Sequence, residues 1–452
     1  MEHMNHHDVI YVNFLEAANE STSYAEFINT IKGTLQDDLR EAYPAVRFRK
    51  NGTAIQDLGM IFEQTKTKFI FVFDEWDCIF HKKYIRNDDK ENFVNYLAAL
   101  TKDKGYISLS YMTGVLPIAK YSSGSTINNF KEYTMATQEK FSEYFGFTNQ
   151  EVDLLYEKYS QNNSNPKVTR QDLTSWYDGY CTPGGVRIYN PRSVVEALSN
   201  NQIASYWTET GSYVEIADYI LSDIEGIKGS ILRMIAGEPI EVNVVERAAT
   251  AMKLSSSDEI LSAMVVYGFL TYENGSVKIP NRELLNEFRQ AVRTAPHLKA
   301  MREIESASLT LLQATLDCDA QTVAKMIGYI RTTDSPHVVY QNEAELSAAV
   351  KIAYLAARGR YEICQEDQAG AGYVDFIFYP RNGKDDGIIL ELKVGKSPEE
   401  ALQQIKDLNY PLRFQGKIGE PAKTTGRIIL VGINCPKGTR EHQCKIEVLD
   451  NQ

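Results

Sequence analysis

The run of five apolar residues at positions 69–73 (FIFVF) places the strongest constraint on how the first part of this chain folds. A strand that is apolar at every position has both faces covered, which is typical of a parallel sheet between layers of helices. Strand-like runs also occur at residues 9–14 (VIYVNF) and 106–112 (YISLSYM), and a helical pattern occupies residues 24–43. This alternation predicts a parallel three-layer α/β sheet for residues 1–145.

The rest of the chain divides into a helical middle and a second α/β region. Residues 146–295 are mostly helical in pattern, with an Asn-Gly turn at residues 274–275 that marks a tight hairpin. A helix followed by a hairpin suggests a small winged-helix-like module there. Residues 296–452 return to an α/β pattern, and we expect their strands at residues 373–379 (YVDFIFY), 387–394 (GIILELKV) and 427–433 (RIILVGI).

The overall charge and the cysteine pattern exclude several classes of protein. The chain has 48 Lys and Arg residues against 60 Asp and Glu residues, a net charge of −12. A chain this acidic is not a general polyanion binder, so contact with DNA would require a local basic face. The six cysteines have no paired spacing, which favours a reducing, cytoplasmic compartment. No window reaches about 18 consecutive apolar residues, so we expect no membrane span.

An acidic pair, Asp74-Glu75, directly follows the apolar run at residues 69–73. An apolar strand that ends in Asp-Glu is the Walker B arrangement of P-loop ATPases. In that arrangement the Asp holds the water shell of Mg²⁺, and the Glu polarises the attacking water. The next expected strand ends close to Thr113, where a polar sensor of the γ-phosphate would sit. A strand end that simply enters solvent explains the same residues.

The phosphate-binding half of a nucleotide site is missing from the sequence. No G-x-x-x-x-G-K-[ST] pattern occurs, and the similar Gly395-Lys396-Ser397 has Leu390 where the first Gly is needed. Without a Lys and a backbone nest, the β- and γ-phosphates of a nucleotide lose their main partners. We therefore expect little or no ATP hydrolysis by this chain alone.

A second constellation lies in two of the expected C-terminal strands. Asp375 lies in the first of them, and Glu391 and Lys393 lie in the next, two positions apart and so on the same face. The two carboxylates and the Leu392 carbonyl provide the hard oxygen ligands that Mg²⁺ or Mn²⁺ prefers. Lys393 could orient the attacking water or help to deprotonate it, in the manner of metal-assisted phosphodiester cleavage.

Two further residues could support this constellation, and the surrounding charge agrees with a nucleic-acid substrate. Glu343 begins a helical stretch and could complete the second shell or hold a second metal, while Gln404 could hold the water or a backbone phosphate. Residues 381–440 contain 11 Lys and Arg residues against 7 Asp and Glu residues. A structural salt bridge between Lys393 and one of the carboxylates, within a solvated basic face, is the alternative interpretation.

Many longer stretches of the chain resemble a bacterial family of AAA-ATPase-like proteins that carry a C-terminal PD-(D/E)XK nuclease domain. The resemblance covers nearly the whole chain and is carried by FDEWD (73–77), TGVLPIAKY (113–121), EYFGFT (143–148), WYDGY (176–180), IYNPRSVV (188–195), YWTETGSY (206–213), NEAELSAAV (342–350), GAGYVDFIFYPR (370–381), ILELK (389–393) and QQIKDLNY (403–410). Members usually begin with a strand and a phosphate loop that this chain lacks, so it resembles an N-terminally shortened member.

The resemblance implies a restriction-endonuclease-like α/β domain at residues 296–452, behind an AAA-ATPase-like remnant at residues 1–145. It maps Asp375, Glu391 and Lys393 onto a nuclease core, which implies a Mg²⁺- or Mn²⁺-dependent hydrolase with DNA as a possible partner. Two alternatives remain: a non-catalytic scaffold, or an ATPase completed in trans by a chain that carries a P-loop. A second copy of this chain, in a homo-oligomer, is the other partner that we consider. The WYDGY motif at residues 176–180 is interpreted as core packing and a turn.

Overall fold

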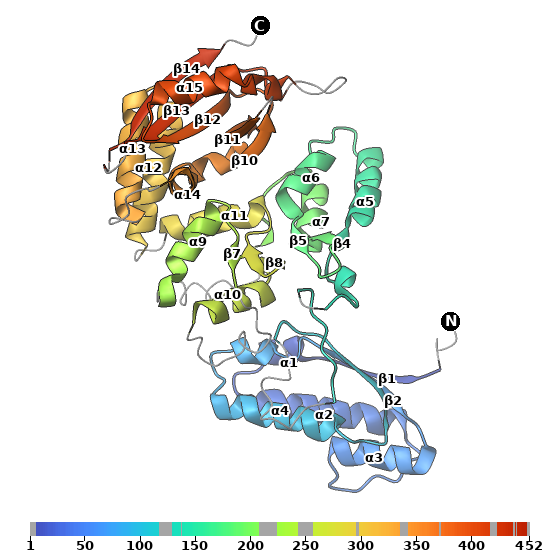
Figure 1. Ribbon diagram of the computed structural model, residues 1–452. Helices are drawn as coiled ribbons and strands as arrows, with labels where there is room; N and C mark the ends of the chain where they lie inside the picture. The colour runs from blue at the N-terminus through green and yellow to red at the C-terminus, as the bar shows by residue number, and fades with distance from the viewer. Residues whose placement is uncertain are drawn as a thin grey trace. The chain divides into compact units, whose positions relative to one another are not determined.

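The computed structural model describes residues 6–116, 129–136, 138–207, 224–242, 256–294, 298–334, 342–369, 372–415, 423–436, 439 and 441–449 (Figure 1). Parts of the quoted stretches 113–121, 206–213 and 370–381 lie outside these residues. The chain forms two compact units. The first comprises Met1–Phe145, Thr182–Val186 and Asn243–Gly268, and the second comprises Gly146–Cys181, Arg187–Val242 and Phe269–Gln452. The boundaries of the three domains expected from the sequence, after residues 145 and 295, stay predictions.

A parallel sheet with the strand order β1-β2-β3 forms the centre of the first unit, as the sequence predicts. The strands and helices follow one another along the chain as β1 (Asp8–Asn13), α1 (Phe14–Glu20), α2 (Tyr24–Ala42), α3 (Ala54–Thr65), β2 (Phe69–Asp74), α4 (Asn87–Thr101) and β3 (Ile107–Met112). Helices α1 and α3 were not expected from the sequence. Helix α3 begins with a capping box, in which Thr53 and Gln56 satisfy each other's backbone amides.

The two faces of this sheet differ in burial. Phe69, Phe71 and Phe73 point to one face, where they are at most 2% exposed and pack with side chains of the helices. The opposite face carries apolar side chains too, but Tyr11 is 59% exposed and Tyr111 is 60% exposed. The expected second layer of helices is therefore not seen among the described residues. The apolar run FIFVF did not distinguish a strand covered on both faces from one with an exposed apolar face.

The predicted Asn-Gly hairpin is present as β8 (Thr271–Glu273) and β9 (Ser276–Lys278). Asn274 and Gly275 have φ angles of 49° and 83°, the left-handed values that a two-residue hairpin turn requires. Helix α10 (Ser257–Val266) confirms the helical pattern before the hairpin. The boundary between the compact units separates this helix from the hairpin, and the winged-helix interpretation stays a prediction.

Short helices and small antiparallel sheets make up the rest of the middle region. The second unit contains β4 (Phe147–Thr148), α5 (Asn149–Asn162), α6 (Arg170–Tyr177), β5 (Tyr180–Cys181), β6 (Arg187–Tyr189), α7 (Pro191–Ser199), α9 (Ile227–Ile235), β7 (Ile240–Glu241) and α11 (Arg282–Thr294). The WYDGY motif ends α6 and starts β5. Tyr177 is fully buried, and Gly179 has a φ angle of 129°, which agrees with core packing and a turn.

The C-terminal region of the second unit is a mixed five-stranded sheet with the order β10-β11-β12-β13-β14. Its elements are α12 (Lys299–Leu316), α13 (Ala320–Asp334), α14 (Glu343–Ala353), β10 (Tyr361–Ala369), β11 (Gly372–Pro380), β12 (Gly387–Val394), α15 (Pro398–Asp407), β13 (Ile428–Cys435) and β14 (Gln443–Leu449). Strands β12 and β13 are parallel, and the other neighbouring pairs are antiparallel.

Both faces of the central strands β12 and β13 are buried, and only Val394 at the end of β12 is partly exposed. Leu402 and Ile405 of α15 pack in one apolar cluster with Ile389 of β12, while Tyr354, which follows α14, makes an edge contact with Phe378 of β11. The sheet is thus enclosed by helical segments, as the apolar strands of the sequence predict. In the described part of the chain, no helix has both the length and the apolarity that crossing a bilayer demands.

Candidate functional site

The pairing of β11 with β12 brings Asp375 and Glu391 together. The antiparallel register aligns Phe376 with Leu390. Asp375 precedes Phe376 and Glu391 follows Leu390, so the two acids are neighbours across the strands. The Leu392 amide donates to Asp375 Oδ2 at 2.7 Å, and the Asp375 amide donates to Glu391 Oε2 at 3.4 Å. Each strand therefore holds the carboxylate of the other, and the two acidic groups meet as the sequence predicts.

Lys393 joins these carboxylates and links them to Glu343. Its Nζ lies 3.0 Å from Glu391 Oε1 and 3.8 Å from Glu343 Oε1. The side chains of Glu391 and Lys393 are 2% and 8% exposed, whereas that of Glu343 is 48% exposed. Glu343 is the first residue of α14, next to the N-cap Asn342, whose side chain accepts from the Glu345 amide at 3.0 Å. The cap thus fixes the helix end from which Glu343 reaches Lys393.

Burial and mutual repulsion disturb the titration of the buried groups. Burial, and then the charge of Asp375, raise the pKa of Glu391 to about 7. Burial also raises the pKa of Asp375, against the stabilising bond from the Leu392 amide. Burial opposes a charge on Lys393, but Glu391, Glu343 and Asp375 together outweigh it and raise the pKa of Lys393. The carboxylates near Lys393 therefore outnumber the single positive charge that the protein places among them.

Gln404 contacts Tyr410, and no hydrogen bond joins it to the carboxylates in the described part of the chain. Its Nε2 is 3.4 Å from the hydroxyl of Tyr410, which in turn donates to the carbonyl of Tyr373 at 2.7 Å. Tyr410 lies within the electrostatic reach of Asp375 and Glu391, which contribute to its raised pKa after burial. Sequence reasoning did not single out Tyr410, although it ends the quoted stretch QQIKDLNY.

A further carboxylate near the site, Glu366, was also missed. Strand β10 was not expected from the sequence, and its register against β11 aligns Gln365 with Phe376 and Asp367 with Val374. Glu366 therefore lies opposite Asp375, and its charge helps to raise the pKa of Asp375. No sequence signal marked it, because EICQEDQA is too polar to resemble a buried strand.

The donor set fits a small divalent cation. Among the residues that the structure describes, no three His, Cys, Asp or Glu side chains converge closely enough to hold a metal ion. Asp375 and Glu391 nevertheless supply two oxygen-bearing groups with uncompensated negative charge. Mg²⁺ is commonly bound by only one or two carboxylates, and waters and substrate oxygens supply the remaining ligands. Leu392 lies between the two charged positions of β12, where the sequence places its carbonyl as a third ligand.

The predicted Walker B-like group lies at the end of the N-terminal sheet. Asp74 ends β2, and its Oδ1 accepts from the Thr113 hydroxyl while its Oδ2 accepts from Tyr11 Oη at 3.0 Å. The Glu75 amide donates to Thr113 Oγ1 at 3.4 Å, and Glu75 has a positive φ angle of 54°. Asp74, Glu75 and Thr113 are thus brought together, with Asp74 half-buried and Glu75 exposed. Burial and the neighbouring acids raise the pKa of Glu75.

Asp77 is a buried acid of the same loop that the sequence reasoning passed over. Its Oδ2 accepts from the amides of Val115 and Leu116 at 3.1 and 2.7 Å, and the Trp76 indole donates to the Leu116 carbonyl at 3.1 Å. The FDEWD stretch therefore fastens the loop that follows β3. This role is structural, because the same carboxylate oxygen holds two backbone amides.

The basic excess of residues 381–440 includes Lys396, Lys406 and Lys417, which could line a phosphate track. Lys406 forms an ion pair with Glu447 at 2.5 Å, while Lys396 is exposed. Lys417 lies outside the described residues. A DNA-binding face therefore stays a prediction.

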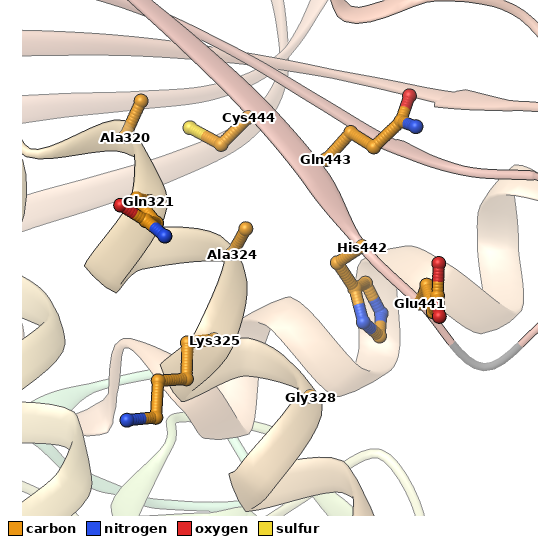
Figure 2. Close-up of a pocket in the computed structure, with 9 residues that line it drawn as sticks. All are labelled: Ala320, Gln321, Ala324, Lys325, Gly328, Glu441, His442, Gln443 and Cys444. Carbon is orange, nitrogen blue, oxygen red and sulfur yellow. The ribbon is translucent and has the colours of Figure 1, made fainter.

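A cavity of about 520 Å³ lies away from the predicted residues, between α13 and the start of β14 (Figure 2). Gln321 and Lys325 line it from the helix, and His442 and Cys444 line it from the strand side. Burial, followed by the charge of Arg331, lowers the pKa of His442 to about 4. The cavity contains none of the residues that the sequence assigns to chemistry.

A comparison with curated proteins finds a relative that matches about three quarters of this chain. A protein of Azotobacter chroococcum mcd 1, described as an uncharacterized protein in the vnfD 5′ region, is 22% identical over 355 residues. The match covers 76% of this chain and 64% of that relative's length.

Two solved structures are similar at low level. A Walker-type ATPase of Pyrococcus abyssi has a TM-score of 0.34 and 14% identity, covering 63% of this chain and 85% of its own. Cdc6p of Pyrobaculum aerophilum has a TM-score of 0.21 and 12% identity, and the match covers 65% of this chain and 80% of that chain. Likenesses this weak carry no argument about function or fold.

The match to a protein family lies on the C-terminal sheet. Residues 341–443 match the PD-(D/E)XK nuclease superfamily, and this range contains Glu343, Asp375, Glu391, Lys393 and Gln404. The match confirms the C-terminal half of the resemblance found in the sequence. This region of the chain is a domain of the PD-(D/E)XK nuclease superfamily.

Proposed function

We propose that the C-terminal domain is a metal-dependent DNA phosphodiesterase. The observation that supports this most strongly is the interlocked pair Asp375 and Glu391 beside Lys393 in the interior of the sheet. Charged groups at this depth are costly unless something compensates them. A divalent cation would neutralise the carboxylates, and a phosphodiester would bring its own oxygens as ligands.

Asp375, Glu391 and the Leu392 carbonyl would hold Mg²⁺ or Mn²⁺. When bound, such an ion stabilises the charge that develops on the phosphorus-bound oxygens. Lys393, whose Nζ lies 3.0 Å from Glu391 Oε1, stays protonated because the surrounding carboxylates raise its pKa, and as a hydrogen-bond donor it would orient the water that attacks phosphorus. Tyr410, which is affected by the charges of Asp375 and Glu391, and Gln404 beside it would position the water or a neighbouring backbone phosphate. Glu343 reaches Lys393 and holds it in place.

For the N-terminal unit we propose no independent ATP hydrolysis. Asp74, Glu75 and Thr113 form the acidic end of a Walker B-like strand, but the sequence supplies no Lys-bearing glycine-rich loop for the phosphates. The unit is proposed as a degenerate ATPase-like module attached to the nuclease domain. Nucleotide binding by the purified chain would contradict this part of the proposal.

The test is cleavage of plasmid DNA by the full chain in the presence of Mg²⁺ or Mn²⁺, with a chelator as the metal-free control. We expect nicking or linearisation by the wild type and its loss in Asp375→Ala and Lys393→Ala. The matched control is Lys384→Ala, which removes an exposed Lys from the same domain and should leave cleavage unchanged.

The outcomes separate the proposed function from its alternatives. Cleavage that persists in both site variants points to a contaminating nuclease and contradicts the assignment of these residues. Equal inactivity of the wild type and all variants, with circular dichroism showing folded protein, supports the non-catalytic scaffold. Activity that depends on added nucleotide and on a P-loop-bearing chain supports the alternative of an ATPase site that a partner chain completes.

A further inference from the structure

Four arginines gather where α11 meets the turn after α14, away from the predicted nuclease residues. We call Arg282, Arg289, Arg358 and Arg381 the arginine cluster. Arg282 and Arg289 lie on α11, Arg358 lies in the short helix Leu355–Gly359, and Arg381 directly follows β11. Asp375 precedes Arg381 by six residues, which at the rise of a strand is about 20 Å.

The backbone of the short helix Leu355–Gly359 fixes two members of the arginine cluster. Arg289 Nη2 donates to the Leu355 carbonyl, and Arg282 Nη2 donates to the Gly359 carbonyl at 3.0 Å. Arg358 belongs to the same helix, and its guanidinium lies on the backbone of Gly237, where a Cβ would fall 1.8 Å from Arg358 Cζ. Any residue other than Gly at position 237 would therefore displace Arg358.

Glu305 and Glu238 are committed to other groups, while Glu362 lies near enough to Arg381 for its charge to oppose the burial that lowers the pKa of Arg381. Glu305 pairs with Arg293 at 2.7 Å, and Glu238 pairs with Arg233 at 2.8 Å and with Lys351 at 3.7 Å.

Within the described residues, no member of the arginine cluster forms an ion pair within 4.0 Å. Arg289 is only 9% exposed, and its Nε is buried without a hydrogen-bond partner. An unsatisfied donor on a buried cation is costly and is normally explained by a group that completes the site.

Each arginine of the cluster feels the charge of its neighbours. Burial, followed by the charges of Arg381 and Arg289, lowers the pKa of Arg358 to about 10. The pKa of Arg282 is lowered by burial and then by Arg381, and that of Arg381 is lowered by burial. Arginine stays charged at neutral pH even so, and the cluster therefore concentrates positive charge in an otherwise acidic chain.

The WYDGY motif supports the arginine cluster. The ring of Trp176 lies under the Arg282 guanidinium, with Cζ 5.0 Å from the ring centroid. Gly179 faces the Pro280 carbonyl, two residues before Arg282, and a Cβ on Gly179 would fall 2.0 Å from that oxygen. The motif thus positions the start of α11, and its Trp176 ring covers one face of the Arg282 guanidinium.

We propose that the arginine cluster binds a phosphate group with two or more negative charges. Guanidinium groups recognise phosphate oxygens through paired donors, and several together exceed what one singly charged phosphodiester would neutralise. A terminal phosphate of a nucleic acid strand and a small diphosphate share this chemistry. This inference stands apart from the proposed nuclease function, because none of the four arginines contacts Asp375, Glu391 or Lys393.

Isothermal titration calorimetry of the full chain tests the proposal, with pyrophosphate as the first probe at about 0.15 M ionic strength. We expect saturable binding by the wild type. Arg381→Gln should raise the Kd about tenfold, and the double variant Arg358→Gln/Arg381→Gln should raise it further. Arg381 is the most exposed member of the cluster, so we expect its substitution to leave the fold intact, and circular dichroism of the variant checks this. Arg192→Gln, which removes an exposed arginine from α7, is the matched control and should bind like the wild type.

A second arm uses oligonucleotides of one sequence with either a 5′-phosphate or a 5′-hydroxyl, in a chelator that suppresses cleavage. Tighter binding of the 5′-phosphate form, lost in Arg381→Gln, assigns the phosphate to a nucleic acid end. Pyrophosphate binding without this preference assigns it to a small phosphorylated ligand. Failure of the wild type to bind either probe, or equal binding by wild type and cluster variants, would overturn the proposal.

Discussion

The chain places an acidic pair on each of its two larger sheets, and the pairs differ in how deep they lie. Glu391 lies inside β12, 2% exposed, with Lys393 at 3.0 Å. Asp74 lies at the end of β2, half-buried, and its neighbour Glu75 is exposed. The first pair shares a buried ammonium, whereas Asp74 accepts from the neutral hydroxyls of Tyr11 and Thr113.

The difference follows from the position of the acids along their strands. Both strands are apolar, but an acid within a strand is enclosed by the sheet, whereas an acid after the last apolar residue reaches water. Burial, and then repulsion from Asp375, raises the pKa of Glu391 to about 7, so the enclosed pair is stabilised by a nearby cation. The N-terminal pair can satisfy its oxygens with hydroxyls and solvent, so its geometry alone does not require an ion.

The largest expected effect comes from removing one carboxylate of each pair. Glu391→Gln should reduce metal-dependent DNA cleavage by at least about 100-fold, because a ligand and a charge are lost where the substrate reacts. Asp74→Asn should leave the rate of cleavage unchanged. Initial rates of plasmid nicking measure both variants. A comparable loss in Asp74→Asn would show that the N-terminal unit takes part in cleavage.

A smaller effect separates the two faces of the N-terminal sheet. Phe71 is fully buried, and its replacement by Ala should destabilise the first unit by about 3–5 kcal/mol. Tyr111 on the other face is 60% exposed, and Tyr111→Ala should cost about 0.5 kcal/mol or less. Urea unfolding reports on this unit through Trp76, which is buried within it, once Trp176 and Trp207 are replaced by Phe. Similar costs at both positions would mean that the second face is covered in solution.

In the C-terminal sheet, sequence patterns predicted the central strands better than the edge strands. Strands β12 and β13 were found, as β2 was in the N-terminal sheet, because runs such as FIFVF and IILVGI are strongly apolar. Strands β10 and β14 were missed because each lies at an edge of the C-terminal sheet and carries polar residues, as in QCKIEVL. An edge strand has fewer buried neighbours, so its sequence is less constrained towards apolar residues.

The candidate site was predictable where its residues share two adjacent strands. Asp375, Glu391 and Lys393 were identified because charges interrupt runs that are otherwise apolar, and pairing of β11 with β12 brings them into contact. Tyr410 and Glu366 approach the site only through the tertiary fold, from a turn after α15 and from an edge strand. Local sequence patterns do not encode such approaches.

Metal binding offers a test of the deeper pair that does not depend on cleavage. Mn²⁺ at about 100 times its Kd should stabilise the second unit by about 2.7 kcal/mol, because the ion binds the folded state alone. The rise in melting temperature relative to a chelator measures this effect. Asp375→Asn should abolish the rise, and Asp74→Asn should preserve it. A rise that survives Asp375→Asn would place the ion elsewhere.

The smallest expected effect concerns how the N-terminal pair is held. Thr113→Val keeps the shape of the side chain but removes the hydroxyl that donates to Asp74 Oδ1 and accepts from the Glu75 amide. The loss of these bonds should cost about 1 kcal/mol, because Asp74 is half-buried and water can replace part of the missing donor. Urea unfolding followed through Trp76 gives the value, with Thr113→Ser as the control that restores the hydroxyl. A cost several times larger, shared by the Ser variant, would mean that packing of the Thr113 methyl group, rather than its hydroxyl, holds the end of β3.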